Sequence, residues 1–104
     1  MDNLLHRICN SKVSIDISLI ENFLKQDENK HLISEQDEDG NTPLHLCLTN
    51  EKCNIDLIRF LVSLPETRAS INKKDEYGDT PLHNACFYNN VEAVQLLVDN
   101  GAFV

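Results

Sequence analysis

Long apolar runs and export signals are missing from this 104-residue chain. No apolar run approaches the roughly 18–20 residues needed to cross a bilayer. Residues 1–10 also lack the apolar core of a signal peptide. These absences argue against a membrane span and against export. We therefore expect a cytoplasmic protein, with the nucleus as an alternative.

Basic residues are also few, with 9 Lys and Arg against 17 Asp and Glu, and the net charge is −8. An acidic surface repels phosphate groups, so we expect no binding to nucleic acid or to membranes. A protein with a basic surface would suit it better. The sequence further lacks a glycine-rich phosphate loop, a G-x-S-x-G motif and an H-E-x-x-H motif. We therefore predict neither enzymatic activity nor a cofactor.

What the chain does contain is an internal repeat. Residues 37–46 read DEDGNTPLHL, and residues 75–84 read DEYGDTPLHN, 38 positions later. Seven of the ten positions carry the same residue in the same order. The segments that follow also correspond, because residues 55–62 match residues 91–98 in their apolar pattern.

A degenerate third copy lies at the N-terminus. Leu5-His6 resembles Leu44-His45, and Leu19-Ile20 stands 38 positions before Leu57-Ile58. This copy lacks the Thr-Pro-Leu-His motif and carries several polar residues, among them Asn10, Lys12, Asp16 and Glu21. The end repeat of an array faces water, so we interpret residues 1–36 as a capping repeat.

The clear copies carry local signals for a turn followed by a helix. Thr42 and Thr80 are good helix N-caps, and the proline after each suits the first helical position. Gly40 and Gly78 suit tight turns that need a positive φ.

Two short helices are predicted in each clear copy. The first runs from the proline to about Asn50 or Tyr88, and the second covers about Ile55–Leu64 or Val91–Asn100. Apolar residues at i, i+3 and i+7 give the second helix one apolar face. Neither helix can bury its face alone, so the copies must stack.

These residues resemble the ankyrin repeat, whose pattern is roughly D-x-x-G-x-T-P-L-H-x-A-A, then I-V-x-x-L-L, then G-A-x-V-N. The resemblance is strong over residues 37–74 and 75–104 and weak over residues 1–36. It implies one domain, an all-α ankyrin-repeat solenoid of stacked helix-turn-helix units with projecting β-turn fingers. The family period is about 33 residues. We place the extra residues, near Asn50–Asn54 and Pro65–Arg68, at turns.

The resemblance implies a protein–protein interaction module that binds a protein partner through its concave groove and acidic fingers. An alternative is a targeting or regulatory segment of a longer multidomain protein or enzyme. In the family, variable positions on the fingers and at the end of the first helix face the groove. The matching residues are the candidate partner-binding set: Glu38, Asp39, Asn41, Thr49, Glu76, Tyr77, Asp79, Phe87 and Tyr88.

Acidic runs at residues 35–39 and 75–79 would stack into a stripe, since ankyrin fingers project in line. Such a stripe suits a Lys/Arg-rich partner, or it serves solubility alone. The aromatic residues Phe23 and Phe60 belong to the second helices and are expected in the core. The histidine of Thr-Pro-Leu-His is implied to be structural, with hydrogen bonds between neighbouring loops.

The four cysteines are Cys9, Cys47, Cys53 and Cys86. Without an export signal they are expected to be free, buried thiols. His6 with Cys9, and His83 with Cys86, have the i, i+3 spacing of two ligands on one helix face. A structural zinc site needs four converging ligands, and these pairs fall in different repeats, so we predict no metal site.

The last repeat has no polar cap, so we expect an open C-terminal end. Such an end suits self-association, or continuation of a longer array. The chain also has twelve asparagines and four alanines. This composition hints at an AT-rich genome, such as that of an intracellular microbe, for which host-directed secretion is another expected localisation.

Overall fold

The structure is a computed structural model that describes residues 3–10, 16–48 and 55–103. The helices are α1 (Leu4–Asn10), α2 (Ile17–Leu24), α3 (Asp27–Lys30), the 3-10 helix η1 (His31–Ser34), α4 (Pro43–Cys47), α5 (Ile55–Val62), α6 (Pro65–Ser70), α7 (Pro81–Phe87) and α8 (Val91–Asp99). Within the described ranges every regular element is a helix, which confirms the all-α fold class.

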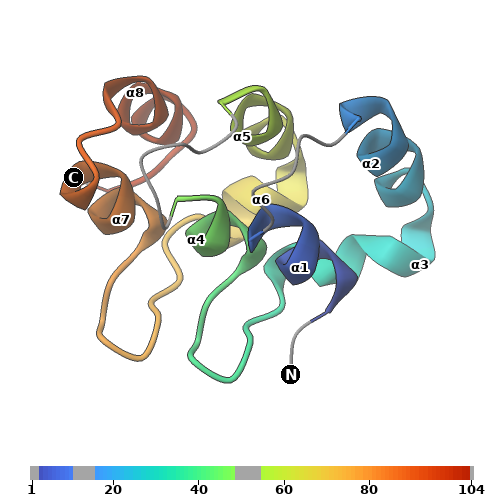
Figure 1. Cartoon of the computed structure of the whole chain (residues 1–104), viewed down its shortest axis with the longest axis horizontal. Coiled ribbons are helices and arrows are strands. Elements are labelled where there is room, and N and C mark those ends of the chain that lie inside the picture. Colours follow the sequence, from blue (N-terminus) through green and yellow to red (C-terminus); the bar gives the residue numbers. More distant parts are fainter. Residues whose placement is uncertain (1–2, 11–15, 49–54, 104) are drawn as a thin grey trace.

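The helices stack in two layers (Figure 1). Helices α1, α4 and α7 lie side by side in one layer, and α2, α5 and α8 form the other. Two loops project in the same direction from the edge of the array (Figure 1). We call residues 35–42 finger 1 and residues 73–80 finger 2. This is the solenoid of stacked units with projecting fingers that the resemblance to ankyrin repeats implies.

The start of α4 has the geometry that Thr-Pro-Leu-His predicts. Thr42 is the N-cap, and its Oγ1 accepts a hydrogen bond from the backbone N–H of His45 at 3.3 Å. In return, His45 Nδ1 accepts one from the Thr42 N–H at 3.1 Å. Ahead of α7, the Thr80 N–H donates to His83 Nδ1 at 2.9 Å. The imidazole thus takes the place of the Glu or Gln side chain in an ordinary capping box.

The predicted glycine turns are confirmed, and α8 ends within one residue of its predicted end. Gly40 and Gly78 have φ angles of 82° and 81°, and Asn89, between α7 and α8, has a φ of 54°. Helix α8 ends at Asp99, and the Ala102 N–H closes the end by donating to the Leu97 carbonyl at 3.0 Å.

Short extra helices follow α2 and α5, and at the second of these places we expected a turn. The prediction placed the residues inserted near Pro65–Arg68 in a turn, but residues 65–70 form α6, which packs against η1 of the preceding repeat. Proline at the first position suits a helix start. Thr67 and Ser70 of this helix are buried. The inserted residues therefore form a helix with its own buried contacts, which a turn prediction missed.

Helix α5 ends at Val62 and not at Leu64 as predicted. Leu64 precedes Pro65, and the proline ring disfavours a helical conformation for the residue before it. Leu64 accordingly has an extended conformation, with φ −88° and ψ 134°. Helices α4 and α7 also end slightly earlier than predicted, at Cys47 and Phe87. The insertion expected near residues 50–54 lies outside the described residues.

One hydrophobic core runs through the described repeats. The leucines of the two Thr-Pro-Leu-His segments, Leu44 and Leu82, are buried, and Ile58 of α5 is completely inaccessible. Phe23 and Phe60 are half-buried and pack against this core, close to the predicted placement. The core holds the fingers on one edge of a rigid stack.

Candidate protein-binding groove

Each finger is built around one aspartate carboxylate. Asp37 Oδ1 accepts hydrogen bonds from the backbone N–H groups two and four residues later, both at 2.9 Å. Asp75 Oδ1 does the same in finger 2, at 2.9 and 3.0 Å. These two carboxylates shape the loops. The exposed carboxylates of Glu38, Asp39 and Glu76 remain accessible to a partner.

The two fingers are hydrogen-bonded to each other. The Glu76 N–H donates to the Asp39 carbonyl at 2.9 Å. Gln36 Nε2 bridges the carbonyls of Gly40 and Lys74, at 2.8 and 2.9 Å. A Cβ atom at Gly40 would lie 2.9 Å from the Glu76 nitrogen, so the backbones approach closely there. The fingers therefore form one preordered edge.

Histidine side chains connect each of the first two repeats to the finger that follows it. His6 Nε2 lies 2.9 Å from the Asn41 carbonyl, and His45 Nε2 lies 2.9 Å from the Asp79 carbonyl. Since His45 Nδ1 accepts the Thr42 N–H, Nε2 carries the proton and donates it. Burial lowers the pKa of His45, opposed by its bond to the Asp79 carbonyl and by nearby carboxylates. His45 thus has the structural role that the family resemblance implies.

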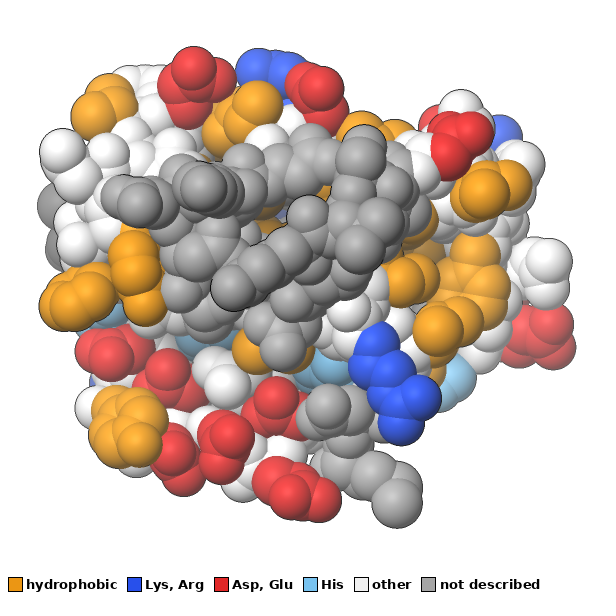
Figure 2. Space-filling model, in the orientation of Figure 1, with side chains coloured by type: hydrophobic (Ala, Val, Ile, Leu, Met, Phe, Trp, Pro, Cys, Tyr) orange, Lys and Arg blue, Asp and Glu red, His pale blue; other side chains and the backbone are white. Residues whose placement is uncertain are grey.

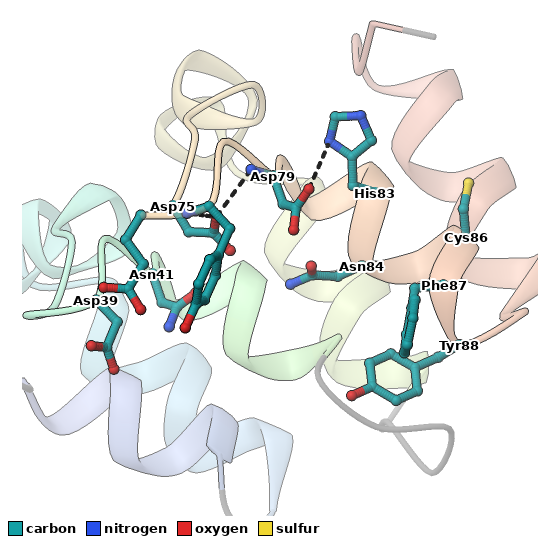
Figure 3. Close-up of a pocket in the computed structure, with 11 residues that line it drawn as sticks. Asp39, Asn41, Asp75, Asp79, His83, Asn84, Cys86, Phe87 and Tyr88 are labelled. Carbon is teal, nitrogen blue, oxygen red and sulfur yellow. Dashed lines mark hydrogen bonds and ion pairs between the residues drawn. The ribbon is translucent and has the colours of Figure 1, made fainter.

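A groove of 880 Å³ opens between the fingers and α7 (Figure 3). Seven of the predicted partner-binding residues line it: Asp39, Asn41, Glu76, Tyr77, Asp79, Phe87 and Tyr88. Glu38 is exposed on finger 1 and does not line the groove. Thr49 lies outside the described residues. The structure thus brings most of the predicted set to one concave surface.

Aromatic side chains are exposed along the groove. Tyr77 on finger 2 is 82% exposed, and Phe87 at the end of α7 is 79% exposed. The rings of Phe87 and Tyr88 meet edge to face, with centroids 5.0 Å apart. A hydrogen bond to Glu76 and the surrounding negative charge raise the pKa of Tyr77 above its ordinary value. Exposed aromatic side chains of this kind are typical anchors of protein interfaces.

The walls of the groove carry mostly negative charge. Finger 1 has four acidic residues and no basic one, and finger 2 has three acidic residues and two lysines. Acidic side chains gather over the projecting fingers in Figure 2. Asp79 Oδ1 lies 3.9 Å from His83 Nδ1, where the finger meets α7 (Figure 3). The groove thus combines an acidic wall with an aromatic one.

Four lining residues were not predicted as site residues: Asp75, His83, Asn84 and Cys86. Cys86 was predicted to be buried, and this is wrong, because its side chain is exposed. Its counterpart in the preceding repeat, Leu48, is buried. Asn84 donates to the His45 carbonyl at 3.4 Å. The replacement of the matching Leu46 by Asn84 was the signal in the sequence that this helix face changes its surroundings.

Metal ligands do not converge in the described part of the chain. Across residues 3–10, 16–48 and 55–103, no three His, Cys, Asp or Glu side chains form a group that could hold a metal ion. Among the helices of those same ranges, none is both long and apolar enough to cross a membrane.

Comparison with known proteins gives a family. The model described as ankyrin repeats (3 copies) matches residues 5–104, nearly the whole chain. No match was found among curated proteins. Ankyrin repeats are generally non-catalytic protein–protein interaction modules. The stacked helix pairs, the paired fingers and this match lead to one conclusion: the chain belongs to the ankyrin-repeat family.

Proposed function

We propose that the groove binds a Lys- or Arg-rich segment of another protein. The observation that carries the proposal is the meeting of acidic and aromatic side chains on one preordered surface. Asp39 and Glu76 come from different fingers and Phe87 from α7, yet all three line the same groove. If the acidic residues served solubility alone, they would not need to lie beside exposed aromatic side chains in one groove.

The two walls would act at different stages of binding. Carboxylates on the fingers attract a basic partner over a distance of about 10 Å at moderate salt and speed its association. The exposed rings of Tyr77 and Phe87 then supply contact area, and an aromatic face also attracts a Lys or Arg side chain. Since the fingers are held by hydrogen bonds before binding, little ordering entropy is lost.

The experiment is a pull-down from lysate with two charge-matched baits. The groove variant carries Glu38→Gln, Asp39→Asn and Glu76→Gln, and the control carries Glu21→Gln, Glu28→Gln and Glu92→Gln. All six carboxylates are exposed, so each bait loses the same charge with little effect on folding. Circular dichroism checks the fold of both.

We expect a partner captured by the wild type and the control, and lost by the groove variant. Capture should weaken as salt rises, because the finger charges are screened. Phe87→Ala should weaken it further at every salt concentration, since its contact is apolar. Equal capture by the groove variant and the control would place the binding surface elsewhere.

A further inference from the structure

The last repeat exposes positions that the preceding repeat buries. Three matching pairs follow from the repeat alignment: His45 with His83, Leu48 with Cys86, and Val62 with Val98. The first member of each pair is at most 2% exposed. Its counterpart in the last repeat is exposed, by 37% in the case of Val98. The two members of each pair have the same place in their repeat. The first member lies beside a following repeat in the structure, and the second does not.

Together with two further valines of α8, these residues form one largely apolar face of the last repeat. Val91, Val94 and Val98 stand at i, i+3 and i+7 of α8, and Val91 is 73% exposed. Next to them, His83 and Cys86 project from one side of α7 (Figure 3). We call these five residues the C-terminal face. His83 Nε2 has no hydrogen-bond partner among the described residues, whereas His6 and His45 donate from this atom to the next finger.

The first repeat exposes two positions that the later repeats bury on the side of the preceding repeat. Leu4 is 51% exposed and Leu19 is 65% exposed. The residues that match Leu4 are Pro43 and Pro81, both buried, and those that match Leu19 are Leu57 and Ala93, exposed by 4% and 0%. In the later repeats a preceding unit lies beside these positions. We call Leu4 and Leu19 the N-terminal face.

We propose that copies of this chain stack head to tail, the C-terminal face of one against the N-terminal face of the next. This contact would continue the interface that joins repeats inside the molecule. That interface joins side chains of the C-terminal-face type to side chains of the N-terminal-face type, and one chain presents both. A single kind of contact between copies would cover both faces. Such a contact is heterologous, so it builds rows and not closed pairs.

Charge gives this assembly a salt dependence opposite to that of the groove. Each copy carries a net charge of −8, so copies repel one another at low salt. Screening weakens this repulsion, and the contact itself is largely apolar. Head-to-tail stacking should therefore increase with salt, whereas binding of a basic partner in the groove should decrease. Failure of one proposal is thus distinguishable from failure of the other.

The test measures mass by sedimentation equilibrium, from micromolar to millimolar protein, at low and moderate salt. A reductant is present throughout, because the exposed Cys86 could otherwise form disulfides. The variants are Leu19→Arg, which blocks the N-terminal face, and Val98→Arg, which blocks the C-terminal face. Ser63→Arg, at an exposed position in neither face, is the control with the same change in charge. Circular dichroism confirms that each variant folds.

We expect wild type and Ser63→Arg to form a concentration-dependent series of oligomers that grows with salt. Each face variant alone should remain monomeric, although its net charge is less negative than that of the wild type. An equimolar mixture of Leu19→Arg and Val98→Arg should form a one-to-one dimer and nothing longer, because each supplies the face that the other lacks.

Three results would overturn the proposal. The first is a strictly monomeric wild type at millimolar concentration and moderate salt. The second is an association that survives Leu19→Arg and is lost only with Val98→Arg, which would mean that two C-terminal faces pair with each other. The third is a mixture of the two face variants that stays monomeric under the conditions in which wild type associates.

Discussion

His45 and His83 occupy the same place in two copies of the Thr-Pro-Leu-His sequence, yet their surroundings differ. Both accept a hydrogen bond from the N-cap threonine at Nδ1. His45 is fully buried and donates from Nε2 to finger 2, whereas His83 is exposed at the end of the stack. A repeat thus specifies its own helix starts, and its neighbour decides which of its side chains are buried. Matched substitutions in the two repeats can measure this difference.

The largest effect is expected in the core of the second helices. Ile58→Ala removes a side chain that is 0% exposed between repeats and should cost about 3 kcal/mol of unfolding free energy. The matched change Val94→Ala affects a half-buried residue and should cost about 1 kcal/mol. Urea unfolding of both variants measures the two costs. Equal costs would mean that the additional burial of Ile58 beside the last repeat contributes nothing to stability.

The two finger glycines should differ by a smaller amount. Gly40→Ala and Gly78→Ala both place a Cβ at a φ near 80°, which costs about 1–2 kcal/mol. At Gly40 the new Cβ also meets the backbone of finger 2 at 2.9 Å, whereas at Gly78 nothing lies within 4 Å. We expect Gly40→Ala to be the more destabilising by about 1 kcal/mol or more. Chemical unfolding of the pair tests this, and a larger loss at Gly78 would contradict the close approach of the fingers.

The histidines themselves come next. His45→Gln should cost about 1–2 kcal/mol, because it disturbs buried hydrogen bonds to Thr42 and to the Asp79 carbonyl. His83→Gln should cost less than about 0.5 kcal/mol, as expected for an exposed position. Thermal unfolding at neutral pH compares the two. A comparable loss at both positions would show that the capping bond, which they share, matters more than the link to the next finger.

The smallest expected effect concerns pH. The pKa of His45 in the folded state lies below its ordinary value of 6.5, chiefly through burial. As pH falls through 6.5, His45 binds a proton in the unfolded chain but not yet in the folded chain. The contribution of His45 to stability is therefore full above this pH, and it declines below it until the folded pKa is reached. His45→Gln should flatten the stability profile between about pH 6.5 and pH 5, where carboxylates contribute less. Denaturation midpoints along this range check the sign. An unchanged slope would exclude His45 as its source.

Signals confined to a few neighbouring residues predicted local structure well. Gly40 and Gly78 have the positive φ angles expected of them, and α4 and α7 begin at the expected prolines. Helix α6 was not predicted. Pro65 suits the first position of a helix, but it lies in an insertion, where a turn was expected. The same proline ended α5 early, through a steric rule that acts on the residue before it.

The candidate groove was predictable in part. The residues on the two fingers were found because consecutive fingers of the array stand side by side, and the hydrogen bond between Glu76 and Asp39 realises that arrangement. Cys86 was predicted to be buried, as free cysteines usually are, and its counterpart Leu48 is indeed interior. The change from Leu46 to Asn84, two residues away, signals that this helix face differs between the repeats. The exposure of Cys86 itself depends on which described repeat lies beside α7, and that is a property of the tertiary structure.

The sequence by itself determined the repeats, the caps, the turns and the negative charge of the fingers. Each of these depends on φ preferences, hydrogen bonds and charges within a few residues. Only the tertiary structure decided which histidine is buried, which apolar residues reach solvent, and which finger and helix residues share a groove. Burial and proximity are properties of surfaces that meet across repeats more than 30 residues apart, and a position acquires them from its neighbours in space.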